Sequence, residues 1–92
     1  MADKKKDQGM ILVLLDRFNK QRLPRAKEFK KKVDAGKVLD EYEEQYIEEV
    51  FQDIDEVKSL VERNPEYKKL LSEIMTMWND IIRKNIENHK KT

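Results

Sequence analysis

The sequence predicts an all-α protein, an antiparallel three-helix bundle whose first helix is kinked at Pro24. Charged residues make up 42% of the 92 residues and apolar residues 38%. This balance is typical of helices that carry one apolar stripe between solvated flanks. Glycine and proline occur only twice each, and the Asn-Gly and Asp-Gly pairs that mark tight hairpins are absent. Apolar residues recur in steps of three and four, which is the helical period.

The first helix is predicted over Met10–Ala35, after a polar stretch over residues 1–9 that has no period and is expected to be disordered. The apolar positions keep one phase across Pro24, although a proline inside a helix removes a hydrogen bond and costs about 3 kcal/mol. We therefore expect a kinked helix, with a break at Gln21–Leu23 as the alternative. Gly36 then ends the helix, because glycine readily adopts the left-handed conformation that follows a last turn. The apolar positions are 11, 12, 15, 18, 23, 26, 29 and 33.

Two further helices follow. Asp40 begins the second, and Glu43 three positions later completes a capping-box pattern. Its apolar residues fall at 47, 50, 54, 57 and 61. The third is predicted to start with Asn64 as the N-cap and Pro65 as the first helical residue, and to leave a frayed tail over residues 89–92. The very short connection predicts an antiparallel hairpin, and residues 10–88 are expected to form one domain.

Composition excludes several classes of function. The chain has no cysteine, which rules out disulfides, thiolate metal sites and a cysteine nucleophile, and favours an intracellular protein. The longest apolar run is Met10–Leu15, whereas a membrane span needs about 20 apolar residues. No signal-peptide cleavage site follows the run. We therefore expect a cytoplasmic protein that does not enter a membrane.

No catalytic, cofactor-binding or metal-ligating residue is predicted. A metal site inside a helical bundle uses Glu-x-x-His motifs, but the single histidine, His89, has Ile86 three positions before it. A Ser/His/Asp set, a glycine-rich phosphate loop and zinc-ligand spacing are all absent from the sequence. The sequence therefore predicts a protein that is not an enzyme and carries no cofactor. The acids weighed as metal ligands are Glu41, Glu44, Glu48, Glu49, Asp53 and Asp55.

Charge is distributed unevenly along the chain. Residues 1–38 hold 12 bases and 5 acids, a net of +7, whereas residues 39–63 hold 2 bases and 10 acids, a net of −8. Residues 64–92 hold 6 bases and 4 acids, a net of +2. We expect the basic first helix to lie beside the acidic second helix, where opposite charges help to select the helix pairing. The bases expected to face acids, either of their own chain or of a twin chain, are Arg17, Lys20, Lys27 and Lys31.

Two kinds of residue are candidates for an interaction surface. The run Met10–Leu15 surrounds its helix within two turns, so one bundle face cannot cover all of it, and exposed apolar surface usually marks a partner. Arg22 and Arg25 flank the proline and could clamp an anion, although a simple bend of the helix is the alternative. Met77 lies beside the apolar stripe and offers a flexible contact. The candidate residues are Ile11, Val13, Leu14, Arg22, Arg25 and Met77.

These observations favour a small non-enzymatic protein–protein interaction or assembly module. The expected partner is another protein or a second copy of the chain in a homodimer. The alternative is a weak nucleic-acid-binding domain that uses the basic first helix, and an anion-binding enzyme is a third hypothesis. Salt-sensitive binding would separate the nucleic-acid hypothesis from the first.

Overall fold

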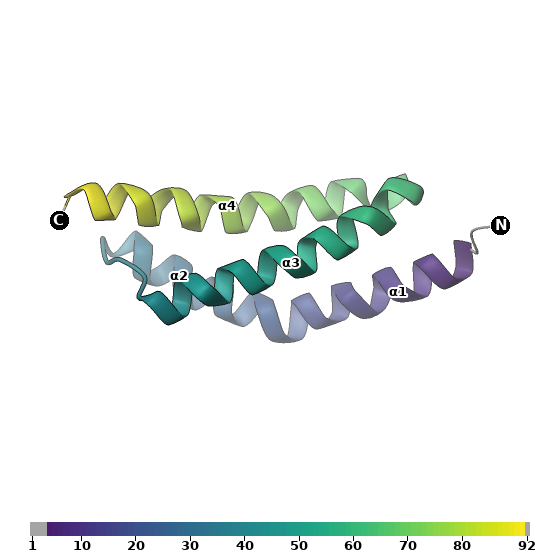
Figure 1. Ribbon diagram of the computed structural model, residues 1–92, viewed down its shortest axis with the longest axis horizontal. Helices are drawn as coiled ribbons and strands as arrows, with labels where there is room; N and C mark the ends of the chain where they lie inside the picture. Colours follow the sequence, from purple (N-terminus) through teal and green to yellow (C-terminus); the bar gives the residue numbers. More distant parts are fainter. Residues whose placement is uncertain (1–3, 92) are drawn as a thin grey trace.

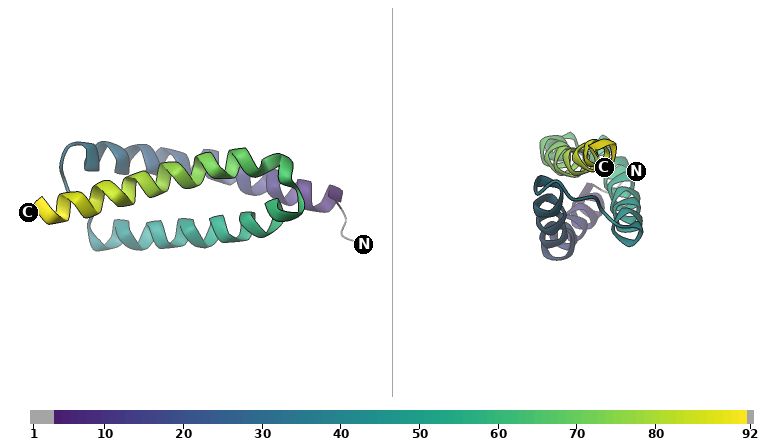
Figure 2. Two further views of the ribbon diagram at one scale, coloured as in Figure 1. Left: turned by 90° about the horizontal axis from the view of Figure 1, so that it is seen from above. Right: turned by 90° about the vertical axis from the view of Figure 1, so that its left-hand side faces the viewer.

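The computed structural model describes residues 4–91, which form three helical rods and contain no strand. The first rod comprises α1 (Lys4–Arg17), the π-helical segment η1 (Phe18–Arg22) and α2 (Leu23–Asp34). The second rod is α3 (Glu41–Arg63), and the 3₁₀ turn η2 (Pro65–Tyr67) leads into α4 (Lys68–Lys91). The rods lie side by side in an elongated bundle with extents of 53 × 19 × 17 Å (Figures 1 and 2). The prediction of an all-α bundle is confirmed.

The first rod is helical without interruption from Lys4 to Asp34, so the alternative break at Gln21–Leu23 does not occur. One wider turn precedes Pro24, in which the backbone N–H of Leu23 donates to the carbonyl of Phe18, five residues back. A proline has no N–H to donate to the preceding turn, and its ring crowds that turn. In a π-helical turn each N–H donates to the carbonyl five residues back, so the carbonyls before the proline are paired differently than in an α-helix. The proline is thus accommodated within a helix.

The polar stretch expected to be disordered over residues 1–9 is helical from Lys4 onward, which corrects that prediction for residues 4–9. Residues 1–3 lie outside the described part of the chain. The extra turns are held by Asp7, whose side chain accepts hydrogen bonds from Arg63 Nε (2.9 Å) and Asn64 Nδ2 (3.3 Å). At the other end, α4 continues to Lys91, so the fraying expected from residue 89 does not appear among the described residues.

The start of α3 is confirmed. Asp40 accepts a hydrogen bond from the backbone N–H of Glu43 at 2.8 Å, and the Glu43 carboxylate accepts one from the backbone N–H of Asp40 at 3.0 Å. The buried residues of α3 include all five of the apolar positions predicted for it. Leu39, just before the cap, is buried as well. Local sequence signals therefore suffice to define this helix.

Asn64 does not cap the third rod as predicted. Its side-chain amide instead donates back to the carbonyl of Leu60 at 2.9 Å and to Asp7, and η2 starts without a side-chain cap. The residue is fully buried and contacts Asp7 near the start of α1. A tertiary contact has therefore replaced the local one, because a buried amide donor must find an acceptor.

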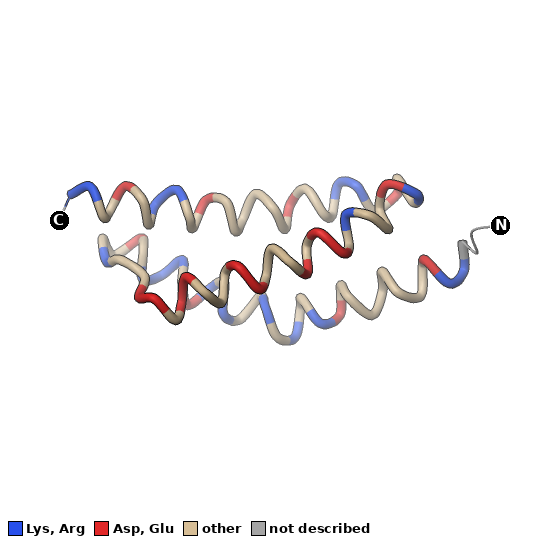
Figure 3. The backbone as a smooth tube through the Cα atoms, in the orientation of Figure 1, with Lys and Arg blue, Asp and Glu red and all other residues tan. Residues whose placement is uncertain are grey.

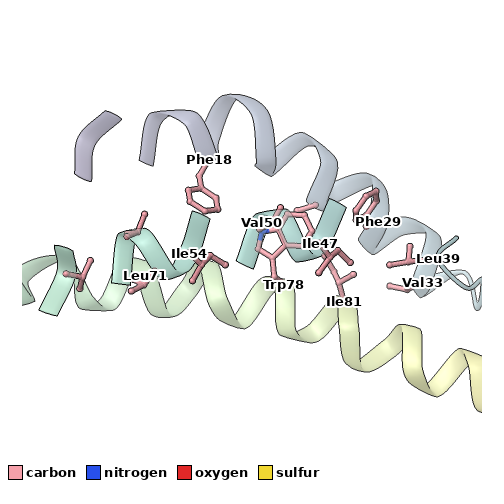
Figure 4. Close-up of a cluster of buried hydrophobic side chains, with 13 residues drawn as sticks. Phe18, Phe29, Val33, Leu39, Ile47, Val50, Ile54, Leu71, Trp78 and Ile81 are labelled. Carbon is pink, nitrogen blue, oxygen red and sulfur yellow. The ribbon is translucent and has the colours of Figure 1, made fainter. Parts of the chain in front are cut away.

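The core lies along the line where the three rods meet, and Trp78 is fully buried within it. Side chains from the first rod, α3 and α4 converge around this indole (Figure 4). The Phe29 ring meets Trp78 edge-on with ring centroids 6.0 Å apart, and meets Tyr46 at 5.6 Å. Such edge-to-face contacts add to the apolar burial that stabilises the bundle.

Two asparagines of α4 hold the connection between α2 and α3. Asn88 Nδ2 donates to the carbonyls of Val33 (2.9 Å) and Lys37 (2.8 Å), and Asn85 Oδ1 accepts from the backbone N–H of Leu39 at 2.8 Å. Both asparagines are buried. They provide partners for the Leu39 N–H and the Lys37 carbonyl in this connection, and a second donor for the Val33 carbonyl, which also accepts from the backbone N–H of Gly36 at 3.0 Å.

Candidate interaction surface

The exposed apolar residues of α1 form the most unusual surface of the molecule. Within this helix Met10 is 47% exposed, Leu12 58% and Val13 68%, although large apolar side chains are normally buried. A helix advances by about 100° per residue, so Leu12 and Val13 point away from the direction taken by Ile11 and Phe18. Ile11 and Phe18 are buried, so the opposite side of α1 faces solvent. We call Met10, Leu12 and Val13 the α1 apolar surface.

The position of α1 at the edge of the bundle accounts for this exposure. By backbone proximity α1 packs mainly against α3, whereas α2 is the part of the first rod that packs against α4. The start of α1 is fixed to the end of α3 by the Asp7–Arg63 ion pair, and to η2 by a hydrogen bond from Gln8 to Glu66 at 3.4 Å. The helix is thus anchored along one side only.

The apolar run Met10–Leu15 is divided between the interior and the surface. Ile11 is fully buried because it lies on the side of α1 that faces the core, so it is not part of the candidate surface. Leu14 is half-buried and packs against the core, so Val13 is the one of these two neighbouring candidates that faces outward. Met10 and Leu12 are exposed and were missing from the candidate residues, although their angular separation from Ile11 and Phe18 could have identified them.

Met77 is likewise only half-exposed. It packs against the core cluster and borders a shallow hollow between α2 and α4 with Lys30 and Asp80. Its side chain fills part of the gap between these two helices, as a flexible methionine commonly does. Met77 is therefore a packing residue at the edge of the core and lies on a different part of the molecule from α1.

Arg22 and Arg25 lie together beside Pro24, but both already have acidic partners. Arg22 Nη2 donates to Asp53 Oδ2 at 2.7 Å, and both side chains are largely buried. Burial disfavours the charge of Arg22, but interactions with Tyr46 and Asp53 outweigh it and raise the pKa of the guanidinium. Arg25 is more exposed and pairs with Glu28 at 2.8 Å. Two arginines balanced by two carboxylates do not attract a further anion strongly.

The same two arginines stack on aromatic rings. The Arg22 guanidinium carbon lies 5.0 Å from the centre of the Tyr46 ring, and that of Arg25 lies 4.9 Å from Phe29 and 5.1 Å from Tyr46. These distances are within the range of cation–π attraction. The cluster fastens the proline region of the first rod onto α3. No local signal in the sequence connects Arg22 with Asp53, which lies 31 positions away.

Acids and bases do meet across the rods, but through residues other than those predicted. Acidic positions run along α3, while basic ones predominate in the first rod (Figure 3). A base of the first rod meets an acid of α3 in the pairs Arg22–Asp53 and Lys32–Glu43 (2.6 Å), and the Asp7–Arg63 pair joins the same rods with the charges reversed. Lys20 pairs locally with Asp16. Among residues 4–91, the exposed bases Arg17, Lys27 and Lys31 form no ion pair, so they do not face acids of their own chain, and the expectation that they face a twin chain stays a prediction.

Two other features bear on the kind of site. Within residues 4–91, no group of three or more acidic or histidine side chains is arranged to hold a metal ion. None of the helices in this described range has the length and apolar character that crossing a membrane requires. When the chain was compared with known proteins, no protein-family model, curated protein or solved structure matched it.

Proposed function

We propose that the protein is a small non-enzymatic protein–protein interaction or assembly module that binds through the α1 apolar surface. Self-association into a homodimer is the first form that we expect, and a different protein is the other possible occupant. The proposal places the module in the cytoplasm, in keeping with a sequence that contains no cysteine.

The observation that carries this proposal is the exposure of Met10, Leu12 and Val13 within four consecutive positions of one helix. Apolar surface in water is unfavourable by about 25 cal/mol for each Å². Several exposed apolar side chains so close together on one helix commonly mark a site where a partner binds. A second chain that covered these side chains would recover this free energy, and a symmetric dimer is the commonest assembly that does so.

The test replaces Val13 with aspartate and measures the mass in solution by sedimentation equilibrium. Val13 is 68% exposed, so the variant should fold normally while losing the dimer. Leu12→Asp should behave in the same way, because Leu12 is 58% exposed. Circular dichroism would confirm that both variants remain helical.

Tyr42→Asp provides a matched control. Tyr42 is an exposed apolar residue at 85% exposure, but it lies at the start of α3 and away from the α1 apolar surface. This variant should keep the mass of the wild-type protein. If Val13→Asp and Tyr42→Asp had the same mass as a dimeric wild-type protein, the α1 apolar surface would not be the contact.

A weak nucleic-acid-binding domain is the second candidate, and one observation favours it. The exposed bases Arg17, Lys27 and Lys31 make no ion pair among residues 4–91, which leaves them available to phosphates. A titration with double-stranded DNA at several salt concentrations tests this hypothesis. Binding that weakens steeply with salt, and weakens further in Lys27→Glu/Lys31→Glu, would support it. The absence of binding at low salt would remove it.

A further inference from the structure

Gly9 lies in the interior of α1, where nothing within residues 4–91 requires a glycine. Its backbone does not have a positive φ, and a methyl group on its Cα would meet no atom within 4 Å. Glycine in a helix interior is less favourable than alanine, because it loses more conformational freedom on folding. Neither backbone geometry nor internal packing therefore accounts for it. A glycine also permits the close approach of another backbone, which is the remaining physical use of such a residue.

Gly9, a position without a side chain, adjoins the α1 apolar surface. Val13 lies one helical turn further on the same side of the helix, and Leu12 lies three positions away from Gly9. Met10 is the next residue in the chain. Exposed apolar side chains thus stand beside a place that has no side chain. Projecting side chains next to a residue without a side chain allow two helices to pack closely together.

We infer that a second copy of the chain packs its α1 antiparallel across this surface, with Val13 of each copy resting over Gly9 of the other. This inference rests on the proposed function and identifies the occupant of the same surface. Val13 and Gly9 are four residues apart. A twofold axis at the level of Ile11 would therefore place Val13 of each copy beside Gly9 of the other. The same contact would form twice, once on each side of the axis, and the dimer would be closed.

Charge favours the antiparallel direction over the parallel one. In the antiparallel register, Lys5 of one copy comes within one residue, about 1.5 Å along the axis, of the level of the partner's Asp16, whereas a parallel pair would set Lys5 beside the partner's Lys5. Lys5 and Asp16 are 11 positions apart on one helix, which is about 16 Å along its axis, so they cannot pair within one chain. Asp16 is exposed and pairs with Lys20 at 3.1 Å, and it stays accessible to a second lysine.

The first experiment replaces Gly9 with larger residues and measures self-association by sedimentation equilibrium. Gly9→Leu should be monomeric, because its side chain occupies the space of the partner's Val13. Gly9→Ala should weaken the dimer at least about tenfold. It should also raise the melting temperature of the dilute monomer, since alanine is the better helix former and meets no clash. Ser59→Leu, at an exposed position of α3, is the matched control and should leave the dimer intact.

The second experiment tests the direction by charge exchange. Lys5→Glu and Asp16→Lys should each weaken the dimer severalfold, because each sets like charges together across the twofold axis. The double variant Lys5→Glu/Asp16→Lys should regain the affinity of the wild-type protein. Rescue of this kind can arise only between chains, given the separation of the two residues on one helix.

The outcomes separate this inference from the proposed function. A wild-type protein that is monomeric at every concentration would overturn both self-association and this contact. If the wild-type protein were dimeric and Val13→Asp monomeric, but Gly9→Leu kept the dimer, the α1 apolar surface would stand and the Gly9 contact would be wrong. If Gly9→Leu were monomeric but the charge exchange gave no rescue, the antiparallel register would be wrong.

Discussion

Asp7 and Arg63 lie 56 positions apart in the chain and form a bidentate ion pair at one end of the bundle. Arg63 Nε donates to Asp7 Oδ2 at 2.9 Å, and Arg63 Nη2 donates to Asp7 Oδ1 at 3.2 Å. Asn64 adds a third donor to the same carboxylate. This contact fixes the start of α1 against the end of α3, and it thereby determines how the α1 apolar surface is presented.

Replacement of Asp7 should loosen this end of the bundle and alter its response to acid. The hydrogen bond from Arg63 holds the pKa of Asp7 below its ordinary value of 3.8. Because the folded-state pKa is the lower one, the contact stabilises the fold above the ordinary value, and that contribution disappears as the pH falls through the folded value. Asp7→Asn should therefore melt at a lower temperature at pH 7 and lose less stability than the wild-type protein on acidification.

Thermal melts from about pH 2.5 to pH 7 would check this prediction, since the range spans the titration of an aspartate. Asp55→Asn is a suitable control, because Asp55 is exposed on α3 and makes no ion pair among residues 4–91. Equal acid sensitivity of Asp7→Asn and the wild-type protein would show that the Asp7 contact does not contribute to stability.

Asn88→Ala should destabilise the connection between α2 and α3. The substitution removes a donor to the part-buried carbonyl of Lys37 and one donor to the buried carbonyl of Val33, which keeps the backbone N–H of Gly36 at 3.0 Å. An unsatisfied buried group costs about 1–3 kcal/mol of the free energy of unfolding. Urea denaturation would measure the loss. Asn79→Ala, at an exposed position of the same helix, should change stability by well under about 1 kcal/mol.

The Arg22–Asp53 pair should show strong coupling in a double-mutant cycle. Only 13% and 15% of the two side chains are exposed, so either residue alone would be a poorly solvated charge. Arg22→Met and Asp53→Leu should each be destabilising, and the double variant should recover about 1–3 kcal/mol relative to their sum. Additive effects in urea denaturation would mean that the two charges are solvated independently.

Much of the fold could be predicted from local sequence signals. The capping box of Asp40 and Glu43 and the spacing of apolar residues in α3 are local patterns, and the structure contains both. The start of α1 was misplaced because Asp7 finds its partners only after the chain has folded back. The amide of Asn64 was assigned to the wrong role for the same reason. The predicted bend at Pro24 stays a prediction, although the helix does continue through that residue.

The candidate surface was less predictable than the fold. A run of six apolar residues indicated that some of them must face solvent, but only the packing of α1 against α3 decides which. That packing buried Ile11 and left Met10, Leu12 and Val13 exposed. Arg22 and Arg25 are singled out by the adjacent proline, yet the contacts of Arg22 with Asp53 and Tyr46 come from packing that no local pattern reveals.

The central claim is that the α1 apolar surface is covered by a second chain, and the mass of the wild-type protein in solution tests it most directly. Sedimentation equilibrium from about 1 to about 200 μM spans the range in which weak assemblies form. We predict a mass that rises with concentration from that of one 11.1 kDa chain to that of two. A mass that stays at 11.1 kDa throughout this range would contradict the claim.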